Sequence, residues 1–150
     1  MNNRILHVED NPDDLMLMEL AFRKAGADVR IESATDGSKA IQMLQNGLGT
    51  VPPACLLLDV KLPILSGLDV LAWIRNQPQL KRLPVIMLTS SFLPDDINRA
   101  YELGANSYLT KPSDLDALVG LAKTIDLYWL RTNTRPELEA SAKLEAQVPA

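Results

Sequence analysis

The sequence predicts an α/β fold in which a parallel sheet is covered by helices on both faces. Short apolar runs alternate with helical patterns along the whole chain, and no internal repeat interrupts them. Five such strand–helix units can be placed, which indicates the flavodoxin-like (βα)5 doubly wound arrangement with strand order 2-1-3-4-5. In that order the carboxyl ends of strands one and three lie side by side, where ligands bind in this class of fold.

The first strand–helix unit carries clear boundary signals. Apolar residues over 4–8 predict strand one, and Asn11 is a favoured helix N-cap followed by Pro12 at the first helical position. Gly26 predicts the end of this helix because glycine readily adopts the left-handed conformation of a helix stop. Strand two is then expected over 29–33.

The remaining units follow from the same kinds of signal. The second helix is expected over 36–48, and Pro52-Pro53 keeps the chain extended into strand three at 54–58. The later elements are predicted from periodicity, with proline or glycine at most of their ends. They are helix three over 67–76, strand four after Pro84, helix four near 95–103, strand five over 106–109 and helix five after Pro112 with Ser113 as its cap.

Composition limits the kinds of protein this chain can be. With 150 residues and 47% hydrophobic content, the sequence fits one domain, expected over 1–131 and followed by a flexible tail at 132–150 with a weak helix near 137–145. The net charge is −4 and no basic stripe is interleaved with aromatics, so we expect no nucleic-acid surface. No stretch approaches the apolar length of a membrane span, and the chain begins with a strand pattern and not a secretory segment, so we expect a cytoplasmic location. His7 and the lone Cys55 lie within apolar runs and are predicted to be buried core residues.

Acidic side chains follow two predicted strands that neighbour each other. Glu9 and Asp10 come directly after strand one, and Asp59 comes directly after strand three. Carboxylates at one sheet edge repel each other unless a cation joins them, and oxygen ligands suit Mg²⁺. Thr89 after strand four and Lys111 after strand five reach the same edge. A metal, a hydroxyl and an ammonium group beside a carboxylate predict a site for a phosphoryl group.

Several fragments stand at the predicted strand ends in a fixed order. They are Val8-Glu9-Asp10-Asn11, Leu58-Asp59-Val60-Lys61-Leu62-Pro63, Gly67, Leu88-Thr89-Ser90, Gly104-Ala105 and Tyr108-Leu109-Thr110-Lys111-Pro112. Each fragment alone is common, but the set in this order is specific. Together they resemble the receiver domain of two-component response regulators over about residues 4–130. The stretch 101–112 and Tyr128-Trp129-Leu130 resemble more narrowly the stand-alone regulators that pair with bacterial phytochromes.

The resemblance implies a role for each residue of the acidic edge. Asp59 would take a phosphoryl group from phosphohistidine and form an acyl phosphate. Glu9, Asp10 and Asp59, with the backbone carbonyl of Lys61, would bind Mg²⁺, with Mn²⁺ as a possible substitute. Lys111 would pair with a phosphoryl oxygen as a point charge.

The resemblance also implies a switch. Thr89 would turn its hydroxyl onto the phosphoryl group, and Tyr108 would move inward into the vacated space. The Lys111–Pro112 peptide would be cis. Lys61 and Ser91, two residues after Asp59 and Thr89, would set the lifetime of the acyl phosphate.

Plainer interpretations exist for the same residues. Asp59 alone could cap the following loop, Glu9 and Asp10 could form an exposed acidic turn, and Thr89 and Tyr108 could be ordinary strand residues. Their joint spacing favours the functional interpretation. Asp13 and Asp14 are expected to act only on the helix dipole and on solubility. Ser66 before Gly67 is expected to be a loop cap that does not touch the chemistry.

Two apolar groups lie outside the motif on predicted helix surfaces. On a helical wheel, Met16, Leu17 and Leu20 face away from the core side of helix one and predict a kinase-docking patch. Leu127 and Leu130 fall on the polar side of helix five and predict a homodimer contact.

The predicted function is therefore a stand-alone receiver, a signalling protein and not an enzyme. It would accept a phosphoryl group on Asp59 from a histidine kinase, such as one of the phytochrome type, or exchange it with a histidine phosphotransfer protein. One alternative is a degenerate receiver that only binds partners. The less favoured alternative is an aspartate-nucleophile phosphohydrolase, which usually needs a second Asp where this chain has Lys61.

Overall fold

The protein, described here from a computed structural model that covers residues 2–47 and 51–138, is built on one five-stranded parallel sheet. The strand order is β2-β1-β3-β4-β5, which confirms the predicted doubly wound topology. The bounds of β1 match the predicted ones, and those of the other strands agree with the predictions to within one residue. They are β1 (Arg4–Val8), β2 (Arg30–Ala34), β3 (Cys55–Leu58), β4 (Val85–Thr89) and β5 (Ser107–Thr110).

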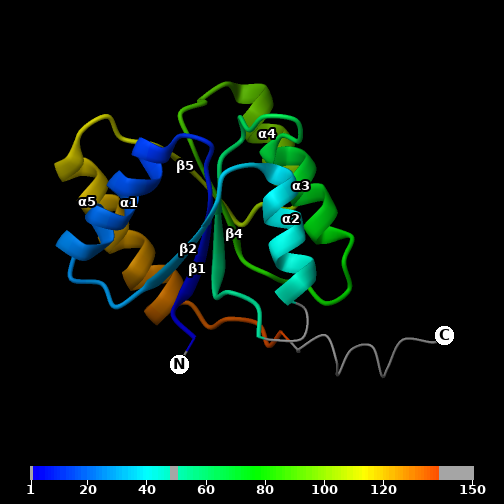
Figure 1. Cartoon of the computed structure of the whole chain (residues 1–150), viewed down its shortest axis with the longest axis horizontal. Coiled ribbons are helices and arrows are strands. Elements are labelled where there is room, and N and C mark those ends of the chain that lie inside the picture. Colours follow the sequence, from blue (N-terminus) through cyan, green and yellow to red (C-terminus); the bar gives the residue numbers. More distant parts are fainter. Residues whose placement is uncertain (1, 48–50, 139–150) are drawn as a thin grey trace.

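Helices cover both faces of the sheet (Figure 1). Helices α1 and α5 lie on one face, and α2, α3 and α4 lie on the other (Figure 1). No helix of the described residues combines the length and the apolar content that a bilayer crossing requires. The helices are α1 (Pro12–Lys24), α2 (Gly37–Asn46), α3 (Gly67–Arg75), α4 (Pro94–Glu102), α5 (Leu115–Ile125) and the π-helix η2 (Asp126–Thr132).

The two faces of the sheet bury two apolar clusters because successive strand residues point to opposite sides. Along β3, Leu56 and Leu58 belong to the α2–α4 side, whereas Cys55 and Leu57 belong to the α1–α5 side. Every residue of β3 is buried, as expected for the central strand. Cys55 is a buried free thiol, as predicted, and burial raises its pKa to about 12.

Most predicted helix boundaries are confirmed, and one cap differs. Asn11 caps α1 by accepting a 2.9 Å hydrogen bond from the Asp13 amide, and Gly26 has the predicted left-handed conformation with φ +73°. Helix α5 is capped by Asp114 and not by Ser113, because the Asp114 carboxylate accepts a 2.8 Å bond from the amide of Ala117.

The end of α5 contradicts one prediction. The chain continues as the π-helix η2, whose wider turn rotates the following side chains relative to an α-helical wheel. Leu130 consequently points into the α1–α5 core and is only 6% exposed, so it is not the surface residue that we predicted. Leu127 is 61% exposed, as predicted.

The segment after η2 contacts the body of the domain. Arg135 donates a 2.7 Å hydrogen bond from Nη1 to the carbonyl of Asn2, and Leu138 packs against the α2–α4 core. Residues 139–150, and with them most of the helix predicted near 137–145, lie outside the described residues. Leu48 at the predicted end of helix two is also outside them.

Candidate functional site

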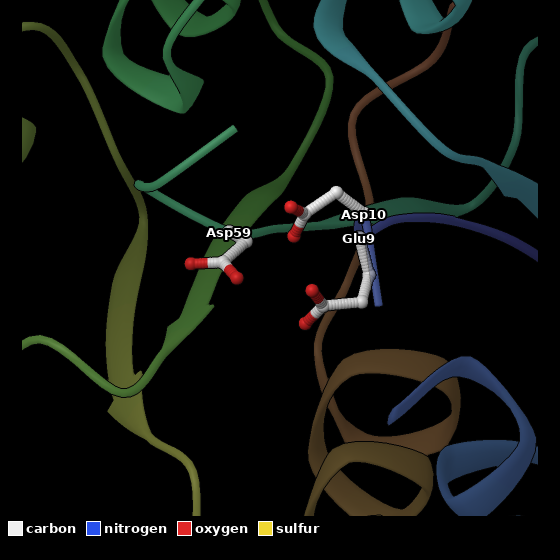
Figure 2. A group of neighbouring side chains, drawn as sticks. All are labelled: Glu9, Asp10 and Asp59. Carbon is white, nitrogen blue, oxygen red and sulfur yellow. The ribbon is translucent and has the colours of Figure 1, made fainter. Parts of the chain in front are cut away.

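Three carboxylates meet at the carboxyl edge of the sheet (Figure 2). Glu9 and Asp10 follow β1 and Asp59 follows β3, and one oxygen from each lies within 4.8 Å of the others. The two strands hold this arrangement through the backbone, because the Asp59 amide donates a 3.1 Å bond to the Val8 carbonyl. Glu9 is 1% exposed and Asp59 is 6% exposed, whereas Asp10 is exposed. Three oxygen donors at this spacing suit a divalent cation.

Lys111 supplies the positive charge of the cluster. Its amide bonds to the Thr89 carbonyl at 2.9 Å, which places the side chain at the end of β5. Its ammonium nitrogen Nζ hydrogen-bonds to Glu9 and lies 3.1 Å from Asp59 Oδ2 and 3.3 Å from Asp14 Oδ2. One ammonium group therefore contacts carboxylates from three elements.

The protonation of the pair follows from burial and charge. Burial raises the pKa of Glu9 to about 7, although the hydrogen bond from Lys111 opposes the shift. Burial lowers the pKa of Lys111, but the hydrogen bond to Glu9 and the charge of Asp59 outweigh it and leave the pKa above its usual value. A divalent cation at the three carboxylates would favour their ionised forms.

Thr89 and Tyr108 lie next to this cluster and share one neighbour. Thr89 is buried at the end of β4, and its Oγ1 accepts a 3.2 Å bond from the Ser91 amide. The half-buried Tyr108 donates a 2.9 Å bond from its hydroxyl to the Ser91 carbonyl. Burial raises the pKa of Tyr108, so its hydroxyl stays protonated as a donor.

A cavity of about 390 Å³ opens over these groups and brings together the residues that the sequence predicted. It is lined by the three carboxylates together with Lys61, Thr89 and Lys111. Gly67 packs against the backbone of Asp59, where a Cβ would overlap the backbone carbonyl oxygen of Asp59. The amide of Lys61 donates a 3.2 Å bond to Asp59 Oδ1 and fixes the orientation of that carboxylate.

The family is decided by comparison with known sequences. The model of the response regulator receiver domain matches residues 5–123. The chain belongs to the response regulator receiver family. Receivers of this family include the stand-alone regulators that the motif resembled, and the predicted fold and the predicted family are both confirmed.

Several curated proteins are similar to this receiver over most of their length. The probable methanogenesis regulatory protein FilR2 of Methanothrix harundinacea is 40% identical over 134 residues, which cover 88% of this chain and 86% of that protein. The response regulator Rcp1 of Synechocystis is 38% identical over 135 residues, which cover 88% of this chain and 92% of Rcp1.

Solved structures agree with these sequence matches. The phosphorylated cyanobacterial phytochrome response regulator RcpA superposes with a TM-score of 0.84 at 35% identity, covering 91% of this chain and 100% of that one. The Mn²⁺-bound form of Rcp1 superposes with a TM-score of 0.80 at 37% identity, covering 90% and 99% of the two chains. The receiver is therefore similar to stand-alone response regulators of phytochrome signalling, as the narrower motif predicted.

Two features of the receiver site differ from expectation. The Lys111–Pro112 peptide is trans, which is the isomer of lower free energy for most X–Pro bonds, and not the cis form that the resemblance implied. Asp14 reaches Lys111 and so belongs to the site, although the sequence assigned it only to the helix dipole. The position of Asp14 near the site could have been inferred from Pro12. This proline starts helix α1 and so places Asp14 in the first turn, beside the acidic edge of the sheet.

The predicted docking residues on α1 are mostly at the surface. Met16 is 66% exposed and Leu17 is exposed, but Leu20 is half-buried. Leu17 borders a second cavity of about 430 Å³ beside the site, which reaches His7 and Lys111. His7 is buried as predicted, and burial lowers its pKa to about 4.

Proposed function

We propose that Asp59 is the phosphoacceptor of this receiver and that the phosphoryl group comes from a histidine kinase or a histidine phosphotransfer protein. An Asp59 oxygen attacks phosphorus, the P–N bond of phosphohistidine breaks, and its electron pair leaves on the imidazole nitrogen. The observation that carries the proposal is the contact of Asp59 with Lys111 Nζ inside an acidic cluster at a strand end.

The proposed resident cation is Mg²⁺, with Mn²⁺ as a substitute. The carboxylates of Glu9, Asp10 and Asp59 would hold it with the backbone carbonyl of Lys61, and the ion would neutralise charge on the transferring phosphoryl group. The Mn²⁺-bound form of Rcp1 supports a divalent cation in a relative of this chain.

The other side chains act around the acceptor. Lys111 exchanges a carboxylate contact for a phosphoryl oxygen. Thr89 turns its hydroxyl from Ser91 to the phosphoryl group, and Tyr108 follows inward. The response is a change in protein–protein affinity. In this proposal the protein is a signalling protein that acts in the cytoplasm with its kinase. Its receiver domain spans 1–131, and a tail follows at 132–150.

The two alternatives are less well supported by the site. A phosphohydrolase of this fold would use an acidic side chain two residues after Asp59, and Lys61 is there. A degenerate receiver would lack one of its charged partners, whereas Glu9, Asp10 and Lys111 all meet Asp59.

Intact mass after treatment with acetyl phosphate and Mg²⁺ tests the proposal. We expect the gain of one phosphoryl group, which disappears in Asp59→Asn and without a divalent cation. Asp13→Asn is the matched control, because Asp13 is an exposed aspartate in the first turn of α1 and touches none of the site carboxylates in the described contacts. A phosphoryl group that persists in Asp59→Asn would refute the assignment.

The proposed partners are a phytochrome-type kinase, which fits the similarity to RcpA and Rcp1, and a second copy of this chain. Met16, Leu17 and Leu20 form the proposed kinase-docking patch. Because Leu20 is half-buried, Met16→Asp is the cleaner test. This substitution should slow phosphoryl transfer from the kinase and leave labelling by acetyl phosphate unchanged. An equal loss of kinase transfer and acetyl phosphate labelling would contradict the docking patch.

The proposed homodimer contact now rests on Leu127, since Leu130 is a core residue. Tyr128 beside it is also exposed and can extend the apolar surface. Leu127→Glu should lower the molar mass in solution of a dimeric sample. An unaltered mass with and without phosphorylation would remove this contact from the proposal.

A further inference from the structure

Ser91 lies in the loop between β4 and α4 and uses all of its polar groups. Its amide donates to Thr89 Oγ1 at 3.2 Å, and its carbonyl accepts from the Tyr108 hydroxyl at 2.9 Å. Its own hydroxyl donates to Asp96 Oδ2 at 2.5 Å. Ser91 is 7% exposed, so these bonds are shielded from water. A single buried residue therefore joins both proposed switch residues to α4.

Helix α4 depends on this residue at its first turn. The N-termini of α1, α2, α3 and α5 are each capped by a side chain, but the N-cap of α4 is Leu93, which makes no such bond. The Ser91 hydroxyl oxygen lies 3.4 Å from the Leu93 amide and can accept from it, and Asp96 stands in the first turn. Only Ala100 of this helix is buried, so little else holds it.

We propose that Ser91 and Asp96 form a relay that carries the state of Thr89 and Tyr108 to the start of α4. The inference rests on the proposed function, because it takes Thr89 to turn toward a phosphoryl group. When the Thr89 hydroxyl rotates away, the buried Ser91 amide loses Thr89 Oγ1 as its hydrogen-bond acceptor, which is unfavourable. The loop shifts to restore a partner, and the bond to Asp96 moves α4 with it. Ser91 is thus a positioning residue.

Asp96 has a plain alternative role at a helix start. A carboxylate in the first turn interacts favourably with the helix dipole, and Asp95 beside it does the same. The two differ in their contacts, since Asp96 is half-buried against Ser91 and Asp95 is exposed. Asp95→Ala removes the same charge from the same turn and is the matched control.

The first experiment needs no phosphoryl group. Amide hydrogen exchange at residues 97–100 is measured in the native chain, Asp96→Ala, Ser91→Ala, the double variant and Asp95→Ala. We expect exchange about 3- to 10-fold faster in each relay variant, which corresponds to one net hydrogen bond, and no further acceleration in the double variant. The relay would be overturned if the double variant exchanged faster than either single variant, by the product of their two accelerations. It would also be overturned if Asp95→Ala accelerated exchange as much as Asp96→Ala does.

The second experiment adds Mg²⁺ and beryllofluoride, which mimics the phosphoryl group, with uptake measured separately by fluorine NMR. The native chain and Asp95→Ala should change their exchange at 97–100 on uptake. Asp96→Ala should take up the same amount without that change. If Asp96→Ala shows the same change in exchange as the native chain, the relay is overturned and the proposed function stands. The same holds if the native chain takes up beryllofluoride but exchange at 97–100 does not change. No uptake by the native chain overturns the proposed function and the relay with it.

Discussion

Helices α3 and α4 follow neighbouring strands of one sheet, but they are held very differently. Helix α3 begins with a capping box in which Ser66 and Asp69 bond each other's backbone, and it buries Gly67, Val70, Leu71 and Ile74. Helix α4 has no side-chain cap and buries only Ala100. The helix beside Asp59, the proposed phosphoacceptor, is therefore held firmly, while the helix beside Thr89, the proposed switch residue, is held loosely. If both roles hold, this difference separates the chemistry of the site from its signal.

The largest expected effect is the loss of core packing under α3. Leu71→Ala should lower the free energy of unfolding by about 2–5 kcal/mol, the usual cost of removing a fully buried leucine side chain. Tyr101→Ala on the exposed side of α4 should change it by less than about 0.5 kcal/mol. Urea unfolding measures both. Comparable losses would show that α4 is anchored as firmly as α3.

The close approach of α3 to the site gives the next effect. Gly67→Ala forces a Cβ against the backbone of Asp59 and should cost about 1–3 kcal/mol of stability as well as slowing phosphoryl uptake. Gly120→Ala in α5 meets open space and should stabilise the protein by about 0.5–1 kcal/mol. Thermal unfolding and uptake from acetyl phosphate check the pair. Normal uptake in folded Gly67→Ala would mean that this contact does not position Asp59.

The smallest effects come from removing the N-cap of α3 and introducing one at α4. Ser66→Ala should lose about 1 kcal/mol of stability, because the capping box of α3 is broken. Leu93→Ser should gain a few tenths to about 1 kcal/mol by supplying α4 with a cap, since Leu93 is exposed and gives up little packing. Denaturant titration measures both variants. Destabilisation by Leu93→Ser would show that α4 is not limited by its missing cap.

The fixed region was also the more predictable one. The ends of β1 and β3 follow from apolar runs and the doubly wound topology, so the meeting of Glu9, Asp10 and Asp59 could be expected from the sequence. Lys111 could be placed at the same edge because it follows the last strand. A cap at Ser66 was likewise expected from its place before Gly67, but as a loop cap, whereas the structure makes Ser66 the N-cap of α3.

The features that sequence reasoning missed depend on local conformation. An α-helical wheel placed Leu130 on the surface, because the apolar pattern of the sequence does not predict the π-helical hydrogen bonding of η2. The bond between Ser91 and Asp96 depends on the path of the loop between β4 and α4. The contact between Asp14 and Lys111 is made by the long, flexible lysine side chain. None of these contacts follows from residue spacing alone.

The most direct test of this comparison is an amide-exchange map of the native chain with and without Mg²⁺ and beryllofluoride. We expect amide exchange to change over residues 91–102 and to stay the same over 67–75. An equal change in both helices, or a change in α3 with none in α4, would contradict the claim that this receiver keeps its chemistry on a fixed region and its response on a loosely held one.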